Sequence, residues 1–359
     1  MRGVVTRDRT LILQNNIPPP TPGPGQVRVK TLACGICGSD LHALHHLDHM
    51  ADMSRRSGVA NILDPNRDVI FGHEFCAEII DYGPDTERRL APGSRVVSIP
   101  MALGPAGMEV VGYSNVFPGG FAETMVLQEM LLVAVPNGLS SALAATTEPF
   151  AVGAHAVARA APYENSVCMI FGCGPVGLAV LAALKARGVG PVVACDFSAA
   201  RRDAAERLGA DHVIDPASQS PHALWGKLNV PATLAEHALS MFTGQQGKRP
   251  VIFECVGAPG MLHAIIEGAP PGARIVVAGV CMQPDTIEPA LAINKQLGLD
   301  FVLGYSPVEF EVTLADIAEG RIDAVAIVSE EIGLAEIPGA FERLSRNPEL
   351  VKVTVDSTR

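Results

Sequence analysis

The pattern of hydrophobic and polar positions divides the chain into three stretches of different texture. Up to about residue 150, short runs alternate apolar and polar residues between turns, as in residues 26–32, which predicts half-buried strands. From residue 166, strand-like apolar runs alternate with helical stretches. After about residue 305 the pattern returns to short mixed elements. We therefore expect an α/β protein in which a β-rich domain accompanies a doubly wound parallel sheet.

The middle stretch predicts six strands with helices between them. Their apolar runs lie at residues 166–171, 192–195, 212–214, 251–255, 274–278 and 301–304. One helix should run from Pro175 to about Arg187, and another should begin after Ser198 as its N-cap. The C-terminal tail is short and should pack on the N-terminal region. This gives a discontinuous domain of residues 1–150 and 304–359 around a domain of residues 151–303.

Composition and charge exclude several classes of protein. The chain has 359 residues, 48% of them hydrophobic, which is enough for two buried cores. The formal net charge is −11, and the chain lacks the clustered basic residues that are typical of a nucleic-acid binder. The N-terminus shows no apolar segment typical of a signal peptide, and the eight cysteines are scattered. Reduced thiols and a cytoplasmic location are therefore expected.

One stretch has the length of a membrane span. Residues 167–184 carry no charge over 18 positions, but Gly172, Gly174, Pro175 and Gly177 interrupt them near the start. These breakers favour a buried strand that turns sharply into a buried helix. No membrane association is expected.

The same glycines form a G-x-G-x-x-G motif between a predicted strand and a predicted helix. Such a loop lets the backbone approach a pyrophosphate at the helix N-terminus. Asp196 follows Gly177 by 19 residues, where a carboxylate accepts hydrogen bonds from ribose hydroxyls and repels a 2′-phosphate. This predicts NAD over NADP, although Arg201 and its neighbour leave some NADP use open. The predicted cofactor-binding residues are Gly172, Gly174, Pro175, Val176, Gly177, Asp196 and Arg201.

Candidate metal ligands gather in the N-terminal region. The segments 34–42 (with Cys34, Cys37 and His42), 72–74 (with His73 and Glu74) and 147–150 (with Glu148) offer the thiolate, imidazole and carboxylate groups that zinc accepts. Cys34 and Cys37 could also form a redox pair, but nothing around them suggests a thioredoxin-like fold. A four-cysteine zinc site would need a second pair of closely spaced cysteines, and the sequence offers only the isolated Cys76. A mixed set of ligands would leave a position open for substrate, as catalytic zinc does.

Longer motifs make a family resemblance specific. The segments CGICGSDLH, GHE and EPFAVGAHA, followed by FGCGPVG and LGADHVID, occur in this order along essentially the whole chain. The chain resembles the zinc-dependent alcohol and polyol dehydrogenases of the medium-chain dehydrogenase/reductase superfamily. The resemblance implies a GroES-like catalytic domain made from both chain ends around a Rossmann NAD-binding domain. It also implies a homodimer or homotetramer.

The resemblance assigns roles to individual residues. Cys37 and His73 match zinc ligands, and either Glu74 or Glu148 matches the third constant ligand. Asp40 matches the acid that orients the ligand histidine. The catalytic pair that carries the alcohol proton away through the nicotinamide ribose is matched by Ser39 and His42.

Two departures from the family pattern change the expectations. The structural zinc lobe uses four closely spaced cysteines, whereas residues 97–120 contain none, so one catalytic zinc and no structural zinc are expected. The interval from Cys37 to His73 is 36 residues, about ten longer than expected of relatives. Its histidines (His45, His46 and His49) could bind a further metal, but a solvated insert near the active-site mouth is the preferred interpretation.

These observations predict an enzyme that reversibly oxidises an alcohol to a ketone or aldehyde with NAD. The partner is a small-molecule alcohol or carbonyl compound, with a leaning toward secondary, medium-sized alcohols. A metal-free quinone or enoyl-type reductase of the same superfamily would lack the ligand set. A non-catalytic NAD-binding protein would not need the relay residues. A methyltransferase would leave the first 150 residues unexplained.

Overall fold

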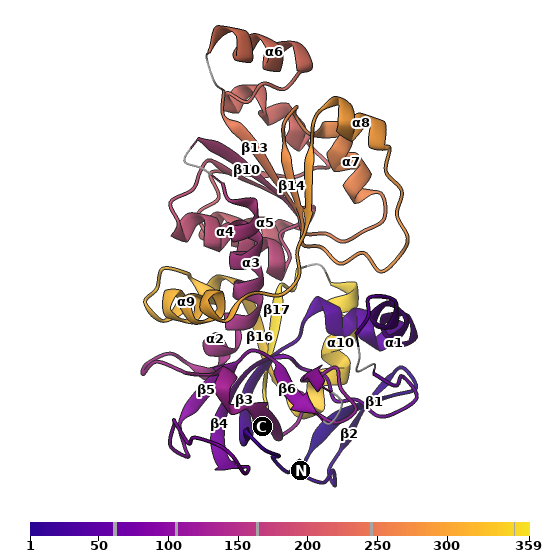
Figure 1. Ribbon diagram of the computed structural model, residues 1–359, viewed down its shortest axis with the longest axis vertical. Coiled ribbons are helices and arrows are strands. Elements are labelled where there is room, and N and C mark those ends of the chain that lie inside the picture. Colours follow the sequence, from indigo (N-terminus) through magenta and orange to yellow (C-terminus); the bar gives the residue numbers. More distant parts are fainter. Residues whose placement is uncertain (60–62, 105–106, 163–164, 245–246, 348) are drawn as a thin grey trace. The chain divides into compact units, whose positions relative to one another are not determined.

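The computed structural model describes residues 1–359 apart from 60–62, 105–106, 163–164, 245–246 and 348 (Figure 1). It contains two compact units. The first comprises Met1–Glu148, Phe310–Glu319 and Val328–Arg359, and the second comprises Pro149–Glu309 and Gly320–Ile327. The first unit thus contains both ends of the chain. The domain boundaries at 150 and 304 stay predictions, because compactness alone does not define a folding domain.

The first unit is built on a seven-stranded sheet. Its strand order is β16-β17-β3-β4-β5-β9, and β8 pairs with β3. The strands are β3 (Gln26–Gly35), β4 (Glu74–Tyr82), β5 (Arg95–Ser98), β8 (Thr124–Gln128), β9 (Leu132–Ala134), β16 (Val328–Gly333) and β17 (Lys352–Asp356). Two hairpins accompany the sheet, namely β1 (Gly3–Arg7) with β2 (Thr10–Gln14) and β6 (Met101–Gly104) with β7 (Gly107–Val110). The C-terminal β17 pairs with β3, which ties the tail to the N-terminal region as expected.

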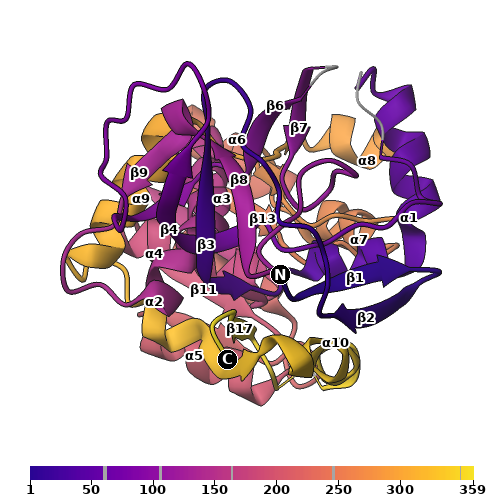
Figure 2. The same cartoon turned by 90° about the horizontal axis from the view of Figure 1, so that it is seen from below.

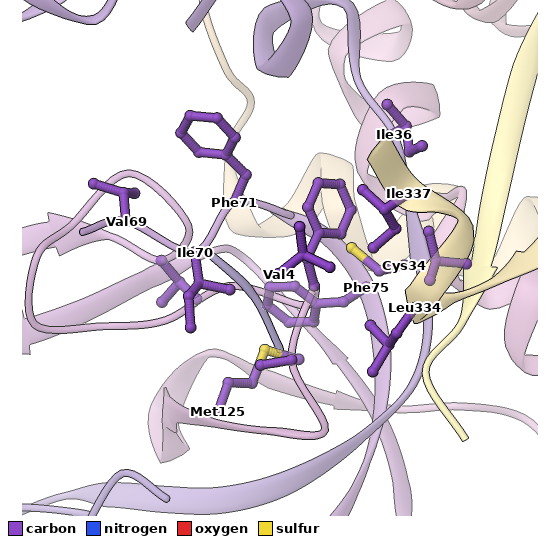
Figure 3. Packing of buried hydrophobic residues seen from close by; sticks show 14 of the residues in the cluster. Val4, Cys34, Ile36, Val69, Ile70, Phe71, Phe75, Met125, Leu334 and Ile337 are labelled. Atoms are coloured by element: carbon purple, nitrogen blue, oxygen red, sulfur yellow. The ribbon is translucent and has the colours of Figure 1, made fainter. Parts of the chain in front are cut away.

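A hydrophobic core lies beside this sheet. Figure 3 shows aliphatic and aromatic side chains from the N-terminal strands and from the C-terminal segment packed together. The thiol of Cys34 points into this cluster near Phe75 and Ile337, and Cys34 is fully buried. Burial raises the pKa of the Cys34 thiol well above its ordinary value. Cys34 therefore behaves as a small apolar core residue.

Helices complete the first unit. They are α1 (Gly38–Arg56), α2 (Ser141–Ala145), the start of α3 (Thr147–Ala160), most of α9 (Pro307–Ala318) and α10 (Ile337–Arg346). In Figure 2 the β1–β2 hairpin lies beside α10. Much of the segment interpreted as a solvated insert is the body of α1. Its apolar residues Ala43, Leu44, Leu47 and Ala51 are buried, while His45 and His46 face solvent. The expectation of a solvated insert holds for one face of this helix only.

The second unit contains a six-stranded, wholly parallel sheet, which confirms the expected fold class. The strand order is β12-β11-β10-β13-β14-β15. The strands are β10 (Ser166–Phe171), β11 (Val192–Cys195), β12 (His212–Ile214), β13 (Arg249–Glu254), β14 (Arg274–Val277) and β15 (Gly298–Phe301). The last strand lies three residues before its predicted position. Pairing with β14 ends at Phe301, and the apolar Leu303 beyond it is exposed.

Helices cover both faces of this sheet. Figure 1 shows α4 (Pro175–Ala186) and α5 (Ala199–Arg207) on one side, and α7 (Met261–Gly268) and α8 (Pro289–Asn294) on the other. Every residue of β10 is buried, as expected of a strand covered on both faces. A further helix, α6, spans Leu234–Thr243. Among the helices that the structure describes, none combines the length and hydropathy needed to cross a bilayer.

Candidate metal centre and dinucleotide site

Pairing of β3 with β4 brings three metal-binding side chains together. Cys37 is the N-cap residue of α1, two residues after β3 ends, and Glu74 begins β4 opposite Gly35. His73 directly precedes β4. The ligand atoms of Cys37, His73 and Glu74 all lie within 4.8 Å of one another. Within the described ranges, this is the one group of at least three such side chains that could hold a metal ion.

Glycines make this approach possible. A Cβ atom on Gly35 would lie 2.0 Å from Oε2 of Glu74, so any side chain there would displace the carboxylate. Gly72 has a φ of +101°. A Cβ atom on Gly72 would lie 2.8 Å from Sγ of Cys34. The glycines of the CGIC and GHE motifs are therefore needed to place His73 and Glu74.

Asp40 links the cysteine to the histidine. Its side chain is fully buried in the first turn of α1, and Oδ2 accepts a hydrogen bond from the backbone N–H of Cys37 at 3.0 Å. Its other oxygen, Oδ1, lies 3.4 Å from Nδ1 of His73. This carboxylate can orient the imidazole so that Nε2 is directed at a metal, which is the arrangement expected of an acid behind a ligand histidine.

The protonation chemistry of the cluster fits a metal ion. Burial disfavours a charged His73, but the charges of Asp40 and Cys37 outweigh it and raise the pKa of His73 well above its ordinary value. Nδ1 of His73 is buried and makes no hydrogen bond that satisfies normal geometry. A divalent cation would replace protons on the sulfur of Cys37, the imidazole of His73 and the carboxylate of Glu74. Zinc accepts this combination of sulfur, nitrogen and oxygen ligands.

A buried lysine, which sequence analysis did not identify, pairs with Glu74. Nζ of Lys352 on β17 lies 2.7 Å from both carboxylate oxygens of Glu74 and donates to the carbonyl of Ile36 at 3.1 Å. Both side chains are 1% exposed. Burial lowers the pKa of Lys352, but the charges of Glu74, Cys37 and Glu148 outweigh this effect and raise it. Lys352 therefore supplies a compensating positive charge inside the candidate centre.

Glu148 lies outside the three-residue cluster. It occupies the first turn of α3 and is partly buried, and its charge acts on Lys352. Of the two glutamates that the sequence left as alternatives, Glu74 is the one whose carboxylate shares the cluster with Cys37 and His73.

The two residues matched to the proton relay lie in different surroundings. Oγ of Ser39 is 2.9 Å from the phenol oxygen of Tyr113, which is also 2.8 Å from Oδ1 of Asp40. Sequence analysis did not identify Tyr113, because it lies in a turn without a recognisable motif. His42 faces solvent on α1. Partial burial, together with the charges of His46 and His45, lowers the pKa of His42.

The glycine motif in the second unit has the geometry of a dinucleotide loop. Gly172 follows β10 with a φ of +91°, and Gly174 is the N-cap of α4, with Pro175 at the first helical position. Val176 follows in the first turn. A Cβ atom on Gly177 would lie only 1.8 Å from the carbonyl oxygen of Gly172, so strand and helix meet here without room for a side chain.

Asp196 is held beside this loop. Oδ2 accepts the N–H of Cys173 at 2.7 Å, and Oδ1 accepts the N–H of Ser198 at 2.8 Å. A guanidinium nitrogen of Arg201 lies 4.0 Å from Oδ2. The structure thus brings the predicted acid, the predicted arginine and the glycine loop together at the ends of β10 and β11.

Comparisons with known proteins define the class of protein. The family described as "Zinc-binding dehydrogenase" matches residues 175–319, and "Alcohol dehydrogenase GroES-like domain" matches residues 23–137. The chain belongs to the zinc-dependent alcohol and polyol dehydrogenases of the medium-chain dehydrogenase/reductase superfamily. This confirms the expected family, the GroES-like and Rossmann fold classes, and the enzyme class of zinc- and NAD-dependent dehydrogenase.

Several relatives of the chain are named as butanediol or sorbitol dehydrogenases. The chain is 31% identical to (R,R)-butanediol dehydrogenase of Bacillus subtilis (strain 168), over 95% of each chain. It is 26% identical to sorbitol dehydrogenase of the same organism, over 100% of this chain and 98% of the relative. The crystal structure of 2R,3R-butanediol dehydrogenase from Bacillus subtilis aligns over 99% of both chains with a TM-score of 0.77 and 26% identity.

Proposed function

We propose that this enzyme oxidises a secondary alcohol of the diol or polyol class to a ketone, with NAD as the preferred cofactor and a single zinc ion. The observation that supports this most strongly is the clustering of Cys37, His73 and Glu74 in one unit of the chain. The butanediol and sorbitol dehydrogenases named above support the substrate class.

Three side chains would hold the zinc ion in this proposal. Cys37 supplies a thiolate, His73 an imidazole nitrogen and Glu74 a carboxylate, which leaves a position for the substrate oxygen. We assign Glu74 as the third ligand because its donor atom shares the cluster. Glu148→Ala should then retain one zinc per chain, whereas Glu74→Ala should lose most of it. The reverse outcome, measured by elemental analysis, would assign Glu148 instead.

The residues around the cluster provide the proton chemistry. When bound, zinc supplies Lewis acidity at the substrate oxygen and NAD accepts the hydride. Asp40 orients His73 through Nδ1 and holds the start of α1 through Cys37. Ser39 would accept the hydrogen bond of the substrate hydroxyl and, as that proton transfers, release its own hydroxyl proton from the site. His42 reaches solvent and exchanges that proton with water.

Asp196 supports the preference for NAD. Its carboxylate is fixed at the glycine loop by two backbone N–H groups, and an incoming 2′-phosphate would meet this negative charge. Arg201 lies close enough to reduce that repulsion without removing it. We therefore propose residual use of NADP.

Three further assignments complete the proposal. Residues 97–120 hold no cysteine, so we assign a single zinc ion and no structural zinc. All eight cysteines are free thiols, which supports a reducing compartment such as the cytoplasm. We propose a homodimer or homotetramer, on the family resemblance alone.

The activity test is direct. The zinc-loaded protein should produce NADH with a panel of secondary alcohols, 2,3-diols and polyols, and should do so faster with NAD than with NADP. Cys37→Ser should lose both zinc and turnover, whereas Cys281→Ser should keep both, because Cys281 lies outside the cluster. Full turnover by Cys37→Ser would contradict the proposed zinc mechanism.

A further inference from the structure

Tyr113 is the one side chain whose phenol oxygen contacts both Ser39 and Asp40 in the described residues. Its oxygen lies 2.9 Å from Oγ of Ser39 and 2.8 Å from Oδ1 of Asp40. Its ring centroid lies 5.2 Å from that of His73, and the two rings are tilted at an interplanar angle of 37°. A single residue thus touches the proposed relay serine, the orienting acid and the ligand histidine.

The turn that carries Tyr113 is built to hold it in place. Oγ of Ser114 accepts the N–H groups of Val116 and Phe117 at 2.8 and 3.0 Å, and Ser114 donates to the Glu109 carboxylate. Gly112 has a φ of +90°, and a Cβ atom there would lie 3.0 Å from the carbonyl oxygen of Gly72. The turn therefore packs directly against the segment that leads into His73.

The hydrogen-bond inventory of these groups sets the direction of each bond. An ionised carboxylate can only accept, so the single phenol proton of Tyr113 is donated to Asp40. The contact with Ser39 then needs the proton of the serine hydroxyl, which Ser39 donates to the phenol oxygen. With its proton directed at Tyr113 before reaction, Ser39 presents its lone pairs elsewhere and can accept the hydrogen bond of an alcohol. It releases its own proton only as the proton of the alcohol arrives.

Tyr113 and His73 also share one oxygen of Asp40. Oδ1 accepts from the phenol at 2.8 Å and lies 3.4 Å from Nδ1 of His73. Removing the phenol oxygen would leave Oδ1 to His73 alone. Acids of this kind tune how strongly a histidine binds its metal.

We propose that Tyr113 is a positioning residue for this reaction, which orients Ser39 to accept the hydrogen bond of the alcohol and weakens the interaction of Asp40 with His73. The part of the inference that concerns Ser39 rests on the proposed function. The part that concerns Asp40 and His73 is tested by zinc affinity, which is measurable without any substrate.

Tyr113→Phe is the informative variant, because it keeps the ring beside His73 and Phe71 and removes only the oxygen. Its kcat should fall about tenfold, with KM within a factor of two, because one orienting hydrogen bond is lost. Its zinc affinity, measured by competition with a chromogenic chelator, should be several-fold higher than that of the wild type. Tyr82→Phe, which loses a phenol bond to the Leu90 carbonyl, serves as the matched control and should change neither quantity.

Ser39→Ala separates positioning from a structural role. In the Ser39→Ala background, Tyr113→Phe should cause no further loss of kcat, since the serine it orients is gone. A structural role would instead make the two losses multiply. Unchanged kcat in Tyr113→Phe, multiplying losses, or a zinc affinity that does not rise would each overturn the inference. Full activity of Ser39→Ala would instead refute the relay in the proposed function, and the chelator result would still test the link from Tyr113 to Asp40.

Discussion

Replacing Lys352 by methionine should strongly destabilise the metal-free protein. Methionine keeps an apolar stem that ends where the Cε atom of lysine lies, but it removes the ammonium that lies 2.7 Å from both oxygens of Glu74. Since both side chains are 1% exposed, water cannot replace the lost partner. The variant therefore leaves a carboxylate buried without a compensating charge.

The magnitude follows from this burial. Removing one partner of a buried ion pair costs about 3–5 kcal/mol, whereas an exposed pair contributes about 0–1 kcal/mol. Arg343→Met is the matched control in the same unit, because Arg343 and Glu330 pair at 2.8 Å with both side chains partly exposed. The free energy of unfolding should thus fall several times further in Lys352→Met than in Arg343→Met.

The assay is urea unfolding of chelator-treated protein followed by circular dichroism. Fluorescence of the single tryptophan is unsuitable, because Trp225 lies in the second unit. Saturating zinc should recover part of the loss, since the cation interacts with the same carboxylate. Adding Glu74→Gln to the Lys352→Met chain should also recover stability. A loss below about 1 kcal/mol, or a double variant no more stable than the single one, would refute the reasoning.

Two further predictions concern the second unit and one concerns the metal centre. Asp196→Asn should raise the ratio of kcat/KM with NADP to kcat/KM with NAD at least tenfold, because the charge facing a 2′-phosphate is lost. Asp203→Asn, in α5, is the control and should leave this ratio unchanged. The N–H of Val192 and the ammonium of Lys185 outweigh partial burial and lower the pKa of Asp211 from its ordinary 3.8. Asp211→Asn should therefore lower the free energy of unfolding by about 0.5–1 kcal/mol at pH 7. In urea unfolding, the difference from the wild type should shrink as the pH falls below 3.8. A difference that does not depend on pH would show that the charge of Asp211 is not its cause. Gly35→Ala should reduce zinc content, since its Cβ atom would lie 2.0 Å from Glu74, and an unchanged zinc content would show that the carboxylate can move without consequence.

Local patterns predicted much of the parallel sheet and the glycine turn that follows β10. Strands β10, β11 and β12 lie at their predicted residues because continuous apolar runs between breakers identify strands buried on both faces. Ser198 is the N-cap of α5, where its side chain accepts the N–H of Arg201, as its residue type predicted. The predicted position of β15 was wrong. The strand is defined by its pairing with β14, which ends at Phe301, whereas the apolar Leu303 that suggested a later strand is exposed.

The parts of the metal centre that could not be predicted depend on contacts between distant residues. Lys352 and Glu74 are 278 positions apart, and no local pattern marks a lysine in a C-terminal strand as buried. Tyr113 reaches Asp40 across 73 positions from a turn without a recognisable motif. In contrast, Cys37, Asp40, His73 and Glu74 belong to short motifs whose residue types already indicate metal chemistry.

X-ray absorption at the zinc edge of the purified protein tests the central claim most directly. We predict one zinc ion per chain with one sulfur neighbour at about 2.3 Å and the remaining neighbours nitrogen or oxygen at about 2.0–2.2 Å. The sulfur signal should disappear with the metal in Cys37→Ser. A site with three or four sulfur neighbours, a second zinc ion, or zinc bound unchanged in Cys37→Ser would contradict the assignment of Cys37, His73 and Glu74 as the catalytic metal centre.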